Sequence, residues 1–145
     1  MDEDQAARRH PVLGTEWDWL ACDASGRVAL LSTGGGGPVL QSVLRSVDQM
    51  NSAVEAARQL PQAGEASEVR RESGDWSDWV AAATQGLYAY DWGPWTGDGP
   101  YTLVAAPSCP VDVEELPPLV ADAARLYRFP LQFADAAELH LPDDA

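Results

Sequence analysis

The sequence contains no lysine, and its strongly basic side chains are nine arginines, against 23 aspartates and glutamates. The formal net charge is therefore −14 at neutral pH. Such a surface repels nucleic acid and anionic lipid, because it cannot neutralise a series of phosphates. It attracts a basic protein quickly and with a strong dependence on salt. We expect no nucleic-acid partner, no membrane partner and a basic protein partner; an acidic surface that serves only solubility is the alternative.

Cysteine and histidine are also scarce, since the chain has only Cys22, Cys109, His10 and His140. Two cysteines do not form a disulfide framework in a chain of 145 residues. The four side chains lack the paired spacing of a zinc site, and the histidines lie in end segments, away from an evident nucleophile. Carboxylate pairs arise by chance among so many acids and are typical of a solvated surface. We predict a non-enzymatic protein with no cofactor and no metal.

Long apolar runs are absent as well. No apolar stretch approaches the roughly 18 residues that a membrane-spanning helix needs. The first ten residues, MDEDQAARRH, are acidic and contain no apolar core of a signal peptide. We therefore expect a cytoplasmic protein whose thiols are reduced.

The residues that are present predict a β-hairpin near the start. In the segment 17–22 the side chains alternate between two faces, and the turn DASG follows at 23–26. The return strand, about 27–33, is nearly all apolar, which favours a position in the interior of the sheet.

Helical spacing of apolar residues predicts a long helix that begins at Pro38 and ends at Leu60. The next segment, 61–74, is polar and is predicted to be an exposed loop. A helix over 75–86, capped by Asp75, and a second hairpin from strands at 87–92 and 101–106 follow. The last patterns predict a capping box of Asp112 and Glu115, a helix from Pro118 through Tyr127 and a short strand over 130–134.

Hairpins and helices in blocks, without strict strand–helix alternation, favour an α+β fold. We predict a mainly antiparallel sheet of two hairpins packed against two to four helices. This single domain covers residues 16–141, and residues 1–15 form a flexible tail.

Four consecutive glycines, 34–37, lie between the apolar strand and the long helix. A phosphate-binding P-loop needs Lys followed by Ser or Thr after its glycines, whereas Pro38 and Val39 follow here. A turn between strand and helix is the favoured interpretation. Binding of an anion or small molecule by backbone N–H groups of this loop is an alternative.

Aromatic side chains cluster in the second hairpin and its loop. Trp92 and Trp95 lie in or beside the turn-rich segment WGPWTGDGP and are flanked by Asp91 and Asp98. Exposed tryptophans are typical of binding hot spots, and nearby acids suit a basic partner. We predict that Asp91, Trp92, Trp95 and Asp98 bind the partner, although strand aromatics in general pack into cores.

The stretch WDWLACDASGRVALLSTGGGGPVL resembles the N-terminal part of a loosely defined group of small bacterial proteins. Some such acidic proteins look like immunity proteins of bacterial toxin systems. The resemblance implies a binding protein that neutralises a toxin by covering a basic active site with an acidic and aromatic surface. The alternatives are a small regulatory or scaffold domain that forms a homodimer, and a small-molecule-binding domain that uses the glycine loop.

Overall fold

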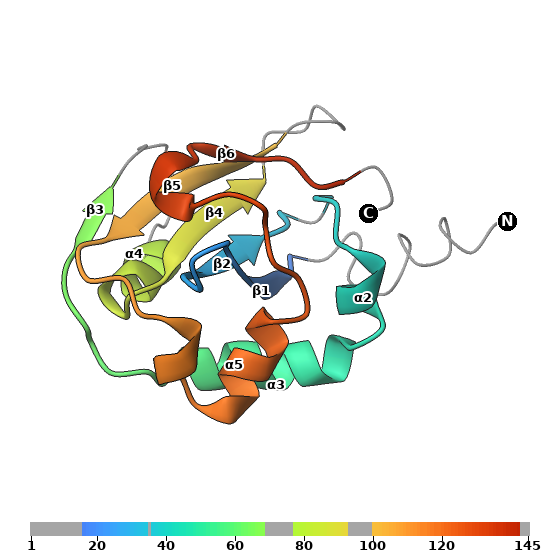
Figure 1. Ribbon diagram of the computed structural model, residues 1–145, viewed down its shortest axis with the longest axis horizontal. Helices are drawn as coiled ribbons and strands as arrows, with labels where there is room; N and C mark the ends of the chain where they lie inside the picture. Colours follow the sequence, from blue (N-terminus) through green and yellow to red (C-terminus); the bar gives the residue numbers. More distant parts are fainter. Residues whose placement is uncertain (1–15, 35, 69–76, 93–99, 143–145) are drawn as a thin grey trace, which may run out of the picture.

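A six-stranded mixed sheet forms the centre of the protein, and four α-helices surround it in the described part of the chain, which confirms the α+β class. The computed structural model describes residues 16–34, 36–68, 77–92 and 100–142 (Figure 1). The predicted tail, 1–15, lies outside these ranges. The elements follow in this order: β1 (Asp18–Cys22), β2 (Val28–Ser32), α2 (Gln41–Leu44), α3 (Val47–Ala57), β3 (Ala66–Glu68), α4 (Ser77–Thr84), β4 (Tyr88–Trp92), β5 (Tyr101–Pro107), the 3-10 helix η1 (Val113–Glu115), α5 (Pro118–Ala124), the 3-10 helix η2 (Phe133–Asp135) and β6 (Glu138–Leu139).

The strands are ordered β1-β2-β4-β5-β3, and β6 also pairs with β5. Both predicted hairpins, β1–β2 and β4–β5, are present and antiparallel. A parallel pairing of β2 with β4 joins them, so the sheet is mixed, which corrects the expected mainly antiparallel arrangement. Parallel neighbours need a long crossover, and α2, α3, β3 and α4 all lie between β2 and β4 in the chain.

The strand β2 has the interior position that its apolar sequence predicts. All five of its residues are buried, and β1 and β4 flank it. On one face Trp79 of α4 donates a hydrogen bond to Ser32, and on the other Phe133 of η2 packs against Tyr90, the strand neighbour of Leu31. The helices α3 and α5 lie together beside β1 (Figure 1).

The long helix predicted from Pro38 to Leu60 is wrong as a single element. The chain forms the short helix α2 and then α3, and Ser46 between them has a non-helical backbone, with φ −125° and ψ 38°. In one straight helix Leu44 and Met50 would project about 120° apart. The break allows both side chains to be buried in the same core.

Two other expectations are corrected at the edges of the sheet. The predicted loop over 61–74 contains the edge strand β3, which pairs with β5, and residues 69–74 lie outside the described ranges. The strand predicted over 130–134 is absent, because the chain turns there into η2. The N–H of Phe133 donates to the buried carboxylate of Asp23 at 2.9 Å, which holds this turn against the first hairpin.

Local signals at helix ends are confirmed. Asp112 and Glu115 form the predicted capping box, on η1. Pro118 is the first residue of α5, as predicted, but the helix ends at Ala124 and not at the predicted Tyr127. Gly86, just after α4, has a φ of +96°, as a left-handed helix end requires. Asp75, the predicted cap of α4, lies outside the described residues.

Candidate functional site

The glycine run forms a closely packed turn between β2 and α2. Gly34 has a φ of +62°, and a methyl group added at Gly37 would lie 2.8 Å from the hydroxyl of Tyr101 and 2.9 Å from Cβ of Trp92. The helix α2 has four residues and so provides no extended N-terminus for an anion. Gly35 lies outside the described residues. The described glycines therefore allow the backbone to approach two aromatic side chains.

Two of the four predicted partner-binding residues, Asp91 and Trp92, are described, and they lie on opposite faces of the sheet. Trp95 and Asp98 lie outside the described residues. Asp91 and Trp92 are consecutive in β4, so their side chains project to opposite faces of the sheet. Trp92 packs on the glycine turn, whereas Asp91 is the strand neighbour of Ser32 on the face that α4 covers. The role of these four residues in binding stays a prediction.

A row of polar side chains crosses the sheet at the position of Asp91. The strand register aligns Asp18 with Ser32, Ser32 with Asp91, Asp91 with Thr102, and Thr102 with Glu138. Residues aligned across neighbouring strands share one face. The row thus places three carboxylates on the face that carries α4, among strands whose other residues are largely apolar.

A cleft lies at one end of this row, between α3 and α4, and we call it the α3–α4 cleft. It consists of two adjoining hollows that share three lining residues, Asp18, Arg58 and Asp78. The acidic hollow encloses about 440 Å³ and is also lined by Glu16, Ser32 and Trp79. The apolar hollow encloses about 210 Å³, and its remaining lining residues are Leu30, Val54, Ala57, Ala81, Ala82, Gln85 and Leu87.

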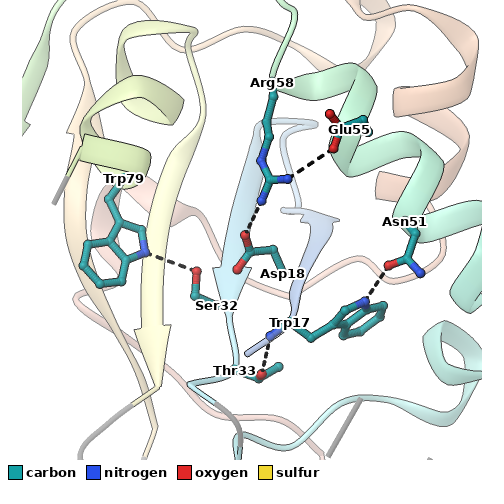
Figure 2. Close-up of polar contacts among 8 residues, drawn as sticks. All are labelled: Trp17, Asp18, Ser32, Thr33, Asn51, Glu55, Arg58 and Trp79. Carbon is teal, nitrogen blue, oxygen red and sulfur yellow. Dashed lines mark hydrogen bonds and ion pairs between the residues drawn. The ribbon is translucent and has the colours of Figure 1, made fainter. Parts of the chain in front are cut away.

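Arg58, just after the C-terminal end of α3, points across the cleft toward β1 (Figure 2). One of its guanidinium nitrogens lies 3.0 Å from a carboxylate oxygen of Asp18, and the other lies 3.3 Å from Glu55. The side chain of Asp18 is only 18% exposed, whereas that of Arg58 is 50% exposed. The guanidinium is therefore paired with two carboxylates, while half of the Arg58 side chain stays exposed to solvent.

Neutral hydrogen bonds fix the walls of the cleft. The indole N–H of Trp79 donates to the buried hydroxyl of Ser32 at 3.2 Å, which sets the orientation of the ring (Figure 2). The indole N–H of Trp17 donates to the side-chain oxygen of Asn51 at 2.6 Å and so connects the start of β1 to α3. The amide of Gln85 donates to the backbone oxygens of Arg58 and of another residue after α3. These bonds hold α3, α4 and the sheet at a defined separation.

The lining determines which chemistry the cleft supports. The described lining offers carboxylates, one guanidinium, a hydroxyl and an indole, and it contains neither histidine nor cysteine. Within the described ranges, no group of three or more His, Cys, Asp or Glu side chains is placed to hold a metal ion. The cleft is suited to ion pairing and hydrogen bonding with a cation.

None of the helices in the described part of the chain combines the length and apolar character needed to cross a bilayer.

Comparison with protein-family models, curated proteins and solved structures finds no match to this chain. Function is therefore inferred from the geometry of the cleft and from the charge of the molecule.

The sequence alone identified one acid of the polar row, Asp91. It did not indicate that the lining residues Asp18, Arg58, Asp78 and Trp79 come together in one cleft. One signal was present: Asp18 lies in a hairpin strand opposite the return strand that is nearly all apolar. Burying an acid within such a strand costs free energy, so its presence there indicates an ion-pair partner or a functional role.

Proposed function

We propose that this protein is a cytoplasmic, non-enzymatic binding protein that acts as an immunity protein. It neutralises a bacterial toxin by covering a basic active site with an acidic and aromatic surface. The surface includes the α3–α4 cleft and Asp91, the strand neighbour of Ser32 in its lining. Trp92, Trp95 and Asp98 stay predicted contacts of the same partner.

The observation that supports this proposal is the arrangement of charge at the cleft. In the described part of the lining, Glu16, Asp18 and Asp78 lie around one cation, Arg58, and the indole of Trp79 forms part of the wall. The lining thus combines an excess of negative charge with an aromatic side chain held in place. Electrostatic complementarity of this kind accelerates association with a basic protein and selects against acidic ones.

The alternative of a homodimer formed through an apolar face has less support. Among the described residues, Leu119 is the one large apolar side chain that is well exposed, at 44%. Apolar dimer interfaces need a contiguous patch, whereas scattered apolar side chains are ordinary on protein surfaces.

The test is an affinity capture of the tagged protein from its own cells at low and at moderate salt, followed by identification of the captured protein. We expect a basic protein that is released as salt increases, because screening weakens opposite-charge association. The purified pair is then used to measure affinity. The double variant Asp78→Asn with Asp91→Asn should bind at least about tenfold more weakly.

The matched control is Glu114→Gln with Asp122→Asn, which removes the same charge at exposed positions of η1 and α5 outside the lining. Its affinity should change by less than about threefold, through the general field alone. Equal weakening of both variants contradicts a specific acidic surface at the cleft. Elution of the protein alone, as a discrete dimer, contradicts the inhibitor function and favours the scaffold alternative.

A further inference from the structure

The two hollows of the α3–α4 cleft together fit a side chain that is apolar along its length and cationic at its tip. The apolar hollow is lined mostly by aliphatic residues such as Leu30, Val54 and Leu87, and Asp18 and Asp78 line both hollows. The volume of the apolar hollow is about 210 Å³. Long basic side chains place an aliphatic stem on apolar surface and keep the charged group in a polar region.

The cleft already contains one guanidinium, that of Arg58. Arg58 pairs with Asp18 at 3.0 Å and with Glu55 at 3.3 Å, and half of its side chain is exposed. The pair with Glu55 is exposed on both sides, and such ion pairs contribute little to stability, so this contact is readily exchanged. The largely buried Asp18 keeps a guanidinium partner when a second arginine takes the place of Arg58. Two further carboxylates of the lining, Glu16 and Asp78, are exposed. Among the described residues, the cleft thus has more negative charge than Arg58 neutralises.

Trp79 adds a contact that favours a guanidinium over other cations. Its ring lines the acidic hollow, and the hydrogen bond to Ser32 holds it in one orientation. A guanidinium stacks on an aromatic face and forms two parallel hydrogen bonds to a carboxylate, whereas an ammonium is a compact and strongly hydrated charge.

We propose that the α3–α4 cleft is the receptor for one arginine side chain of the basic partner protein. The stem of that arginine enters the apolar hollow, and its guanidinium pairs with Asp78 and Asp18 beside the ring of Trp79. Arg58 occupies part of this position in the free protein and moves away when the partner binds. The identity of the occupant rests on the proposed function, because that function supplies a basic protein.

The test is a titration of the isotopically labelled protein with N-acetyl-arginine amide, followed through the indole N–H signal of Trp79. The signal is assigned by its loss in Trp79→Phe. We expect a saturable shift with a dissociation constant on the order of 1 to 10 mM, as is usual for a ligand of this size. N-acetyl-citrulline amide, which has the same shape without the charge, should bind at least about tenfold more weakly, because it cannot form the ion pairs.

Two substitutions at the cleft should change the affinity in opposite directions. Asp78→Asn should weaken binding of the arginine probe about three- to tenfold, since it removes one exposed carboxylate. Arg58→Gln should strengthen binding about two- to fivefold, because it removes the competing guanidinium. The hydrogen bond from Gln85 to residue 58 is accepted by the backbone oxygen, so it does not depend on the side chain of Arg58 and is kept in the variant. Glu114→Gln is the control and should leave the affinity unchanged.

Three results would overturn the proposal: equal binding of the arginine and citrulline probes, weaker binding in Arg58→Gln, or no saturable shift up to about 50 mM probe. Free L-arginine binding about tenfold more tightly than the capped probe would replace it with a small-molecule site, because the α-amino and carboxyl groups would then be recognised. The titration contains no partner protein. A titration without binding therefore does not contradict the proposed function. An affinity capture that finds no partner does not contradict binding of arginine by the cleft.

Discussion

The carboxylate of Asp23 is fully buried and accepts three backbone hydrogen bonds. One oxygen accepts from the N–H groups of Ser25 and Arg27, each at 2.9 Å, and the other accepts from the N–H of Phe133, also at 2.9 Å. This single side chain closes the first hairpin turn and attaches the C-terminal segment to it. The sequence predicted the turn role of Asp23 but not its contact 110 residues away.

We expect Asp23→Asn to lower the free energy of unfolding by about 2–4 kcal/mol. The amide loses the charge that strengthens all three bonds, and its NH₂ group faces a buried donor. Urea unfolding, compared at an unchanged m value, measures the loss. Glu114→Gln, at an exposed position, should change stability by less than about 0.5 kcal/mol. A similarly small change in Asp23→Asn would contradict the structural role assigned to this carboxylate.

Two buried tyrosines couple stability to alkaline pH. The hydroxyl of Tyr90 donates to the backbone oxygen of Ala136 at 2.7 Å, and that of Tyr101 donates to Pro38 at 2.8 Å. Burial raises the pKa of both phenols above the ordinary value. The unfolded chain loses these protons at about pH 10, the ordinary pKa of a tyrosine side chain, while the folded protein retains them. Above about pH 10 the unfolded state therefore binds fewer protons, and stability falls as pH rises.

We expect the urea midpoint to be steady below about pH 9 and to decrease between about pH 10 and 11. Tyr101→Phe should flatten this decrease, although the variant starts from a lower stability because the hydroxyl also accepts from Trp19. Spectrophotometric titration of the phenols gives an independent readout of the same ionisation. A midpoint that stays constant up to about pH 11 in the parent protein would contradict the coupling.

At the scale of elements, the turn between β2 and α2 depends on close packing of its glycines. A methyl group at Gly37 would lie 2.8 Å from the Tyr101 hydroxyl and 2.9 Å from Cβ and Cγ of Trp92. A methyl group at Gly36 would meet only the outer edge of the Trp92 ring, at 3.1 Å. The first clash involves a buried hydrogen-bonded group, whereas the second is relieved by a small movement of the ring.

We therefore expect Gly37→Ala to destabilise the protein by about 1–3 kcal/mol, as overpacking in a core does. Gly36→Ala should cost less than half as much. Thermal unfolding of the two variants side by side measures the order. The reverse order, or equal stability of Gly37→Ala and the parent protein, would mean that the run serves flexibility and not packing.

The elements that the sequence predicted are those whose signals are local. The turn at Asp23, the capping box at Asp112 and the helix start at Pro118 each depend on residues within a few positions of one another. The parallel pairing of β2 with β4 depends instead on strands separated by more than 50 residues, and no local pattern specifies it. The break at Ser46 likewise depends on distant packing, because it allows Leu44 and Met50 to be buried in the same core.

The candidate site was less predictable than the fold for the same reason. The α3–α4 cleft brings together Asp18, Arg58 and Asp78, which lie on three separate elements or their ends. Their convergence depends on the parallel pairing and on the way in which α4 packs over β2. Asp91 was identified because acids and aromatics adjoin in the chain. The alternation along β4 places its side chain on the face opposite to that of Trp92, beside Ser32.

At the scale of the whole molecule, the net charge of −14 acts on stability and on binding in opposite directions. Within the folded protein, like charges repel one another and destabilise the compact state. Toward a basic partner, the same charges attract. Salt screens both interactions, with a Debye length of about 30 Å at 0.01 M and about 10 Å at 0.1 M. Added salt should thus stabilise the free protein while it weakens the complex.

We expect the melting temperature of the free protein to rise by about 3–8 °C between roughly 10 mM and 300 mM NaCl, which corresponds to about 1–2 kcal/mol for a chain of this length. Differential scanning calorimetry measures the rise, and KCl should give the same result because the effect is screening. Sulfate is avoided, since it stabilises proteins through exclusion from their surface. A melting temperature that falls with added salt would show that attractive pairs such as Arg58 with Asp18 outweigh the general repulsion. In that case, the acidic surface would be balanced within the molecule and would offer less charge to a partner.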